Sequence, residues 1–159
     1  VDGEHEARID DEGIVSLQMQ DVPNIKEYFG DFILNTGSPH YVKLVNDIEN
    51  IDVLSEGKAI RYSDRFKLEG TNVNFIQKKD EQLFVRTYER GVENETLSCG
   101  TGVTAAALVA SILGLSNNKN NCLIKNLALP SLSAVSLYEN SPALFPKPKS
   151  TNTDAFPKV

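Results

Sequence analysis

The sequence predicts an α+β fold in which β-strands surround one apolar helix. Residues 103–113 read VTAAALVASIL, a run of strong helix formers with almost no polar face, which indicates a buried helix. Several other segments alternate apolar and polar residues, as half-buried strands do. With 159 residues the chain is long enough for one domain with a real core.

Five segments are expected to be strands. Residues 14–19 alternate apolar and polar side chains. Residues 32–34 and 41–45 flank a Thr-Gly-Ser-Pro turn and therefore predict a strand pair. Residues 73–77 and 82–88 are expected to pair in antiparallel fashion around a charged Lys-Lys-Asp-Glu turn.

Two helices are expected between these strands and after them. Residues 51–60 predict a short amphipathic helix, with Asp52 near its start and Gly57 breaking or ending it. The apolar helix that follows the last of the five strands is expected to end at Gly114, which can adopt the left-handed conformation of a C-terminal cap.

The end of the chain differs in composition from the rest. A polar loop over residues 117–121 leads to a further predicted strand that starts at Cys122. Residues 128–159 then hold five of the seven prolines and show no clean periodicity, so we expect a divergent, poorly ordered tail. The predicted organisation is therefore a short N-terminal remnant (residues 1–22), one lobe (residues 23–127) and this tail.

Composition excludes several classes of function. The formal net charge of −6 argues against binding to nucleic acid or to an anionic membrane surface. No apolar run approaches the roughly 20 residues of a membrane span, and we expect a cytoplasmic protein. The two cysteines, Cys99 and Cys122, form no disulfide framework, and no Cys/His cluster has the spacing of a metal site.

The stretch Thr96-Leu-Ser-Cys-Gly-Thr-Gly102 places a cysteine where the apolar helix begins. Gly100 and Gly102 carry no Cβ and so allow a ligand to approach the backbone closely. The positive end of the helix is expected to lower the pKa of Cys99, and the free N–H groups there form an anion site. A thiolate beside a carboxylate site suggests chemistry on an amino or hydroxy acid. The alternative is a small buried residue at a helix start.

Together with other segments, this motif resembles the diaminopimelate epimerase family, whose members epimerise an amino acid without a cofactor. The matching segments are Asp2–Ala7, Thr36–His40, Arg65–Phe66, Gly70–Phe75 and Val85–Ala107. The resemblance implies a two-lobed protein. Each lobe is a curved antiparallel or mixed, barrel-like β-sheet wrapped around a central helix that presents one catalytic cysteine. This chain resembles the second lobe with the trailing strands of the first, so the first catalytic cysteine is expected to be missing.

The resemblance implies roles for the residues around the helix start. Cys99 would be one of two thiols on opposite faces of the substrate, of which one removes the α-proton and the other returns a proton. Gly100 and Thr101 would donate N–H groups to the α-carboxylate. Glu89 and Arg90 would bind the ammonium and carboxylate groups at the distal end of the substrate. The alternative for Glu89 and Arg90 is an exposed ion pair.

Five further residues are assigned less directly. Asn72 matches a family asparagine that binds the distal end, and Asn74 lies on the same side if the segment is a strand. His40 resembles a family histidine near the catalytic pair, where it would set thiol protonation or orient Glu89. Ser38 departs from the pattern, because many relatives have asparagine there. Cys122 is expected to be a buried core thiol rather than the second base.

The predicted function is therefore an isomerase of lysine and peptidoglycan biosynthesis that interconverts LL- and meso-diaminopimelate without pyridoxal phosphate. A proline-racemase-like two-thiol enzyme is the alternative activity, and a non-catalytic half-enzyme is the alternative class. The Glu89–Arg90 pair favours the first reading, because proline has no distal charged end to bind. The expected partners are the substrate and the missing first lobe, and a homodimer is one assembly that the resemblance allows.

Overall fold

A computed structural model of the chain describes residues 4–9, 11, 15–80, 82–115 and 123–126. Its strands are β1 (Ala7–Ile9), β2 (Val15–Leu17), β3 (Ile25–Tyr28), β4 (Asp31–Asn35), β5 (Pro39–Leu44), β6 (Asn72–Lys79), β7 (Gln82–Glu89), β8 (Asn94–Thr96) and β9 (Leu123–Asn126). Its helices are α1 (Val53–Arg61) and α2 (Gly100–Ile112). The predicted α+β fold is confirmed.

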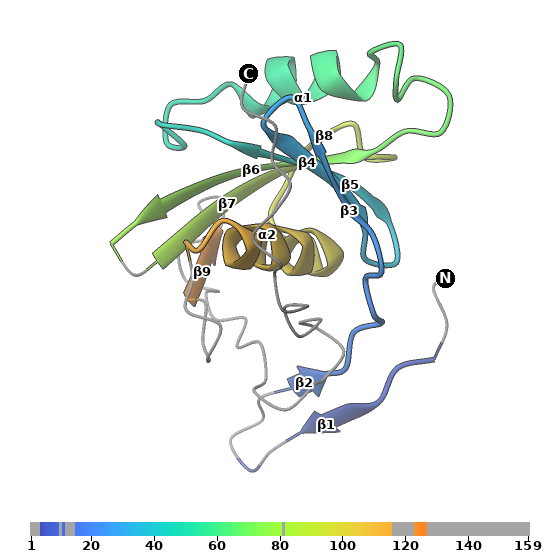
Figure 1. The fold of residues 1–159 in the computed structure, drawn as a ribbon, viewed down its shortest axis with the longest axis vertical. Coiled ribbons are helices and arrows are strands. Elements are labelled where there is room, and N and C mark those ends of the chain that lie inside the picture. The colour runs from blue at the N-terminus through green and yellow to red at the C-terminus, as the bar shows by residue number, and fades with distance from the viewer. Residues whose placement is uncertain (1–3, 10, 12–14, 81, 116–122, 127–159) are drawn as a thin grey trace, which may run out of the picture.

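Seven of the described strands form one mixed sheet in the order β3-β4-β5-β6-β7-β8, with β9 beside β7. All neighbours are antiparallel except β5–β6 and β7–β9, and α1 makes the crossover between β5 and β6. β1 and β2 form a separate hairpin (Figure 1). The sheet is open: β3 and β8 end the path of described strands and do not pair, so the sheet does not close into a barrel.

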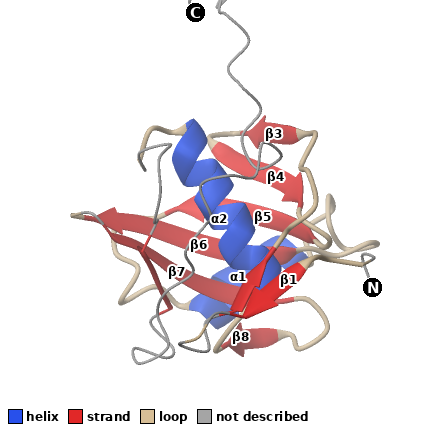
Figure 2. Cartoon of the chain, turned by 90° about the horizontal axis from the view of Figure 1, so that it is seen from below, coloured by secondary structure: helices blue, strands red, loops and turns tan. Residues whose placement is uncertain are grey.

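The two helices cover opposite faces of this sheet (Figures 1 and 2). Side chains alternate between the faces of a strand, and the buried residues follow this rule. On the α1 face lie Tyr41, Val53, Val73, Phe75 and Tyr88. On the α2 face lie Phe32, Leu34, Val42, Ile76, Leu83 and Val85, packed against residues 103–110 of the helix. Each face therefore has its own core.

Helix α1 begins where predicted, because the Asp52 carboxylate accepts the backbone N–H of Ser55 at 3.0 Å as an N-cap. The prediction that Gly57 breaks or ends this helix is wrong. Gly57 lies inside α1 and is buried against Tyr88; an added Cβ would lie 2.6 Å from the Tyr88 Cγ. The glycine is there for close packing of helix on sheet rather than for chain reversal.

Helix α2 is buried from Gly102 to Ala110, as its apolar sequence predicts. It ends as predicted at Gly114, which has a φ of +67°. The N–H groups of Gly114 and Leu115 bond back to Ser111 and Ala110 at 3.0 and 2.8 Å, which is a Schellman cap.

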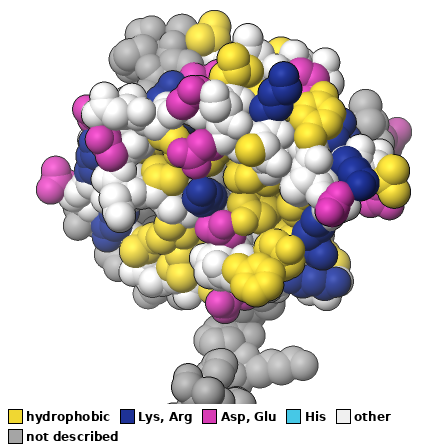
Figure 3. Space-filling view, turned by 90° about the horizontal axis from the view of Figure 1, so that it is seen from above, with side chains coloured by type: hydrophobic (Ala, Val, Ile, Leu, Met, Phe, Trp, Pro, Cys, Tyr) yellow, Lys and Arg dark blue, Asp and Glu magenta, His cyan; other side chains and the backbone are white. Residues whose placement is uncertain are grey.

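The remaining predictions are met in part. The alternating segments are strands as expected, and β9 begins at Leu123. The loop at 117–121, Cys122 and the tail at 128–159 lie outside the described residues. Within the described residues, no helix has the length and apolar character of a membrane span. Seen from the α1 side, hydrophobic side chains are interspersed with charged ones (Figure 3).

Candidate active site

The candidate site is built around the start of α2, where Cys99 is the N-cap residue. Its backbone is extended (φ −144°, ψ 98°), and its carbonyl accepts the N–H of Val103 at 2.9 Å. The Cys99 thiol lies 3.7 Å from the Thr101 hydroxyl oxygen, and the N–H of Gly102 is directed at the sulfur.

Gly102 is required by close packing at this point. A Cβ on Gly102 would lie 3.0 Å from the Cys99 sulfur and 3.3 Å from the Asn74 side-chain carbon. A Cβ on Gly100, in contrast, would meet nothing within 4 Å, because Gly100 borders open space. The two glycines of the motif therefore have different roles. Gly102 lets the helix approach the sheet, and Gly100 leaves room for a ligand.

The sheet is polar beneath this end of α2. His40 of β5, Asn72 and Asn74 of β6, and Thr87 of β7 are all buried. By strand alternation they share the face that bears Val42, Ile76 and Val85 under the rest of the helix. The same face is thus an apolar core along most of α2 and a buried polar cluster at its start.

These polar residues form a continuous chain of hydrogen bonds. The Asn74 amide nitrogen donates to the Thr87 hydroxyl at 2.8 Å, and the Asn74 oxygen lies 2.7 Å from His40 Nδ1. The other ring nitrogen of His40, Nε2, lies 3.0 Å from the Thr101 hydroxyl, which in turn faces Cys99. The chain joins three strands to the first turn of α2.

Burial lowers the pKa of His40 to about 4, and the positive charge of Arg90 acts in the same direction; the bond to Asn74 offsets this only in part. The ring is therefore neutral at physiological pH. Both ring nitrogens are engaged by Asn74 and Thr101, so His40 does not orient Glu89 in this structure. Its contact with the thiol runs through Thr101.

The expected fall in the pKa of Cys99 is not observed. Burial raises the pKa of the thiol, and the negative charge of Glu89 raises it further. A hydrogen bond from the Gly102 N–H opposes this rise and does not outweigh it. The prediction considered only the helix end, whereas the removal of the sulfur from water dominates. At neutral pH the resting site contains a thiol.

Asn72 links the segments that carry the other predicted residues. Its amide nitrogen donates to the Ser38 hydroxyl at 2.9 Å and to the Pro39 carbonyl at 3.2 Å. Its oxygen accepts the backbone N–H of Arg90 at 2.9 Å. Both amide hydrogens are thus used within the protein. Asn72 fixes the position of Ser38 and Arg90, and the half-buried Ser38 hydroxyl keeps its own hydrogen for another partner.

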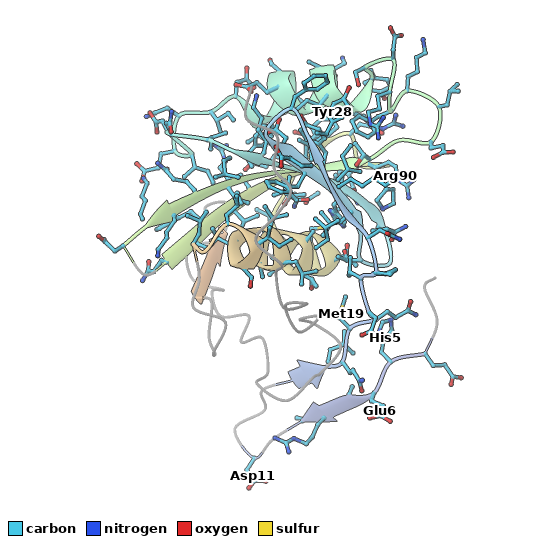
Figure 4. All side chains as sticks on the ribbon, in the orientation of Figure 1. His5, Glu6, Asp11, Met19, Tyr28 and Arg90 are labelled. Carbon is cyan, nitrogen blue, oxygen red and sulfur yellow. The ribbon has the colours of Figure 1, made fainter. Side chains whose placement is uncertain are left out.

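Glu89 is the last residue of β7, and Arg90 follows it. Arg90 lies on the side of the sheet at which α2 begins (Figure 4). Glu89 is half-buried and lies on the α2 face by alternation from Thr87. Arg90 is exposed, and one guanidinium nitrogen donates to the Glu69 carbonyl at 2.9 Å. Gly70 makes this possible, because a Cβ there would lie 2.6 Å from the Arg90 Cδ. Among the described residues, Glu89 and Arg90 do not form an ion pair with each other.

The structure therefore gathers the predicted residues at one end of the sheet, around the start of α2. Thr87 and Thr36 were missed from sequence. The Thr36 hydroxyl donates to the Thr101 carbonyl at 2.8 Å and so fixes the first turn of α2. Thr87 had a readable signal, because it follows the apolar Leu83 and Val85 on one face of β7 and is buried like them. Among the described residues, no group of three His, Cys, Asp or Glu side chains is arranged to hold a metal ion.

Comparison with known proteins shows the family of this chain. The family model for diaminopimelate epimerase matches residues 32–130, which include every residue of the buried polar chain. The chain belongs to the diaminopimelate epimerase family. The resemblance inferred from the motifs is confirmed.

Individual relatives carry the same name. The diaminopimelate epimerase of Flavobacterium psychrophilum is 47% identical over 121 residues, which are 76% of this chain and 47% of that protein. The Aquifex aeolicus enzyme is 53% identical over 59% of this chain and 34% of that protein. The chain thus spans between a third and a half of the length of these relatives. A solved PhzF-family phenazine biosynthesis protein from Enterococcus faecalis aligns with a TM-score of 0.45 and 17% identity, covering 72% of this chain and 38% of that one.

Proposed function

We propose that this chain provides one half of the active site of a diaminopimelate epimerase, with Cys99 as an acid–base group at the α-carbon. The substrate is LL- or meso-diaminopimelate, and the reaction exchanges these stereoisomers by proton transfer. The observation that carries the proposal is the position of Cys99. Within a member of this family, it is the N-cap of a buried helix, beside free N–H groups and above a buried polar cluster.

The α-carboxylate of the substrate binds at the start of α2. The N–H groups of Gly100 and Thr101 are in the first turn and have no acceptor within the helix. Open space at Gly100 leaves room for the carboxylate. Negative charge grows on this group as the α-proton leaves, so the same N–H groups stabilise the transition state more than the ground state.

The distal end of the substrate binds between Glu89, Arg90 and Ser38. The Arg90 guanidinium donates one bond to the Glu69 carbonyl and presents its remaining N–H groups to a carboxylate. The Glu89 carboxylate accepts from the distal ammonium group. Asn72 acts through Ser38 and Arg90, since its amide hydrogens donate to the Ser38 hydroxyl and the Pro39 carbonyl and its oxygen accepts the Arg90 N–H.

The proton transfer needs two groups on opposite faces of the α-carbon. In one direction the Cys99 thiolate takes the α-proton and becomes a thiol, while a second thiol gives its proton to the other face and becomes a thiolate. Inversion follows without a pyridoxal cofactor. We propose that the second thiol belongs to the other lobe, and that this chain alone does not invert its substrate.

Protection against alkylation tests this proposal. Trypsin places Cys99 in residues 91–119 and Cys122 in residues 120–125, so mass spectrometry follows each cysteine separately. Diaminopimelate is expected to slow the alkylation of Cys99 by iodoacetamide and to leave Cys122 unchanged, and proline is expected to protect neither. Protection of Cys99 by proline instead would favour the proline-racemase-like activity. Equal rates for Cys99 with and without diaminopimelate would contradict a binding site here.

A further inference from the structure

We propose that Asn74 is a positioning residue, which acts through His40 and Thr101 to hold the Cys99 thiol in its protonated form. This inference rests on the proposed role of Cys99 as an acid–base group. It assigns a function to a buried asparagine whose hydrogen bonds go to His40 and Thr87 rather than to the thiol.

The direction of the hydrogen bonds follows from the chemistry of their ends. The Asn74 nitrogen donates to Thr87, so the Asn74 oxygen is the atom that faces His40. An amide oxygen only accepts, and the neutral ring of His40 must therefore carry its hydrogen on Nδ1. That tautomer leaves Nε2 as an acceptor. The Thr101 hydroxyl at 3.0 Å must then donate to it.

This orientation of the Thr101 hydroxyl affects the protonation state of Cys99. A hydroxyl has one hydrogen, and in Thr101 this hydrogen points to His40 rather than to Cys99. The Thr101 oxygen, 3.7 Å from the sulfur, can accept from a thiol but offers no hydrogen to a thiolate. Asn74 thus favours the thiol over the thiolate of Cys99 through two intervening residues, His40 and Thr101.

The packing keeps this chain in place. Asn74 is fully buried, and a Cβ on Gly102 would press on its amide group, so the side chain is held between the sheet and α2. Two charged groups face the chain from β7 and from the residue after it. Glu89 acts on Cys99, and Arg90 acts on His40, which favours the neutral ring. Both charges support the state that Asn74 selects: a neutral histidine and a protonated thiol.

The test is the pH dependence of Cys99 alkylation in the full chain, followed on the peptide of residues 91–119. In Asn74→Leu the ring is no longer held in the Nδ1–H tautomer, so Nε2–H can donate to Thr101 and the hydroxyl can turn toward the sulfur. The midpoint of alkylation is then expected to fall by about one pH unit, which raises the thiolate population at neutral pH about tenfold. Thr104→Val is the matched control. It removes a buried hydroxyl from the same turn of α2, which donates to the Gly100 carbonyl at 3.1 Å, and is expected to leave the midpoint unchanged.

A second variant keeps the test decisive if Asn74→Leu does not fold. Thr101 is only half-buried, and Thr101→Val is expected to leave the midpoint nearly unchanged, because its hydroxyl hydrogen does not serve the sulfur. A rise of about one unit in Thr101→Val would show that the hydroxyl donates to the thiolate, and would overturn the proposal. An unchanged midpoint in folded Asn74→Leu, or an equal fall in Thr104→Val, would do the same. None of these readings needs substrate, so they separate this inference from the proposed reaction.

Discussion

The two faces of β6 and β7 carry opposite kinds of residue near the same end of the sheet. Toward α1 the strands present Val73, Phe75 and Tyr88, which are fully buried and apolar apart from one hydroxyl. Toward the start of α2 they present Asn72, Asn74 and Thr87, equally buried but polar and hydrogen-bonded to one another or to neighbouring strands. Strand alternation lets a single segment supply a core on one side and a site on the other.

The comparison teaches what each face is for. The α1 face gains stability from apolar burial and close packing, as where Gly57 lies against Tyr88. The polar end of the α2 face gains little net stability from its hydrogen bonds, because these groups were hydrogen-bonded to water before folding. These hydrogen bonds instead fix the positions of the atoms around Cys99. Substitutions on the two faces should therefore affect different properties.

The largest effect is expected on the α1 face. Phe75→Ala removes a fully buried ring and should lower the free energy of unfolding by about 3–5 kcal/mol, measured by urea denaturation. Phe29→Ala is the control, because Phe29 is 92% exposed and its loss should cost under about 0.5 kcal/mol. Similar losses in the two variants would show that the α1 face is not a packed core.

A somewhat smaller effect is expected from the pH dependence of stability. The pKa of His40 is lowered to about 4, so between that pH and the ordinary value near 6.5 the unfolded chain binds the extra proton. Stability should therefore fall as the pH drops through this window, by about 3 kcal/mol in total. In His40→Gln this contribution disappears, and the difference between the two denaturation series isolates it from the carboxylates. Parallel pH profiles for wild type and His40→Gln would contradict a buried neutral histidine.

The smallest effects on stability are expected at the two helix glycines that face the sheet, and these variants distinguish the two faces most clearly. Gly57→Ala presses a methyl group on Tyr88 and should cost about 1–3 kcal/mol without moving the alkylation midpoint of Cys99. Gly102→Ala presses on Asn74 and on the Cys99 sulfur, and should change the alkylation of Cys99 even where the protein stays folded. If both variants altered the thiol equally, the two faces would not be independent.

Most of the fold follows from local sequence. The alternation of β4 to β7, the apolar run of α2 and its end at Gly114 are all visible in short segments. The function of Gly57 is not, because it depends on Tyr88, which lies far along the chain. Whether the sheet closes into a barrel is also not visible in a short segment, because it depends on whether the end strands β3 and β8 pair, which they do not.

The site was predictable as a set of residues but not as an arrangement. One motif contains Cys99, Gly100 and Thr101, and Glu89 and Arg90 lie shortly before it in the sequence. The bonds of His40 to Asn74 and Thr101 join residues 34 and 61 positions apart, which no local pattern reveals. The direction of the Cys99 pKa shift was misjudged for the same reason. Burial of the sulfur is a property of the assembled fold, whereas the helix end is a property of the sequence.

The most direct test of the central claim is exchange of the α-proton of diaminopimelate in heavy water, followed by mass spectrometry, for the 159-residue chain and for Cys99→Ala. A single thiol that removes the proton returns a deuteron to the same face. The wild-type chain should therefore incorporate deuterium without changing the ratio of LL to meso forms, and Cys99→Ala should incorporate none above background. Equal incorporation by the two chains, or none by either, would contradict the assignment of Cys99 as an acid–base group.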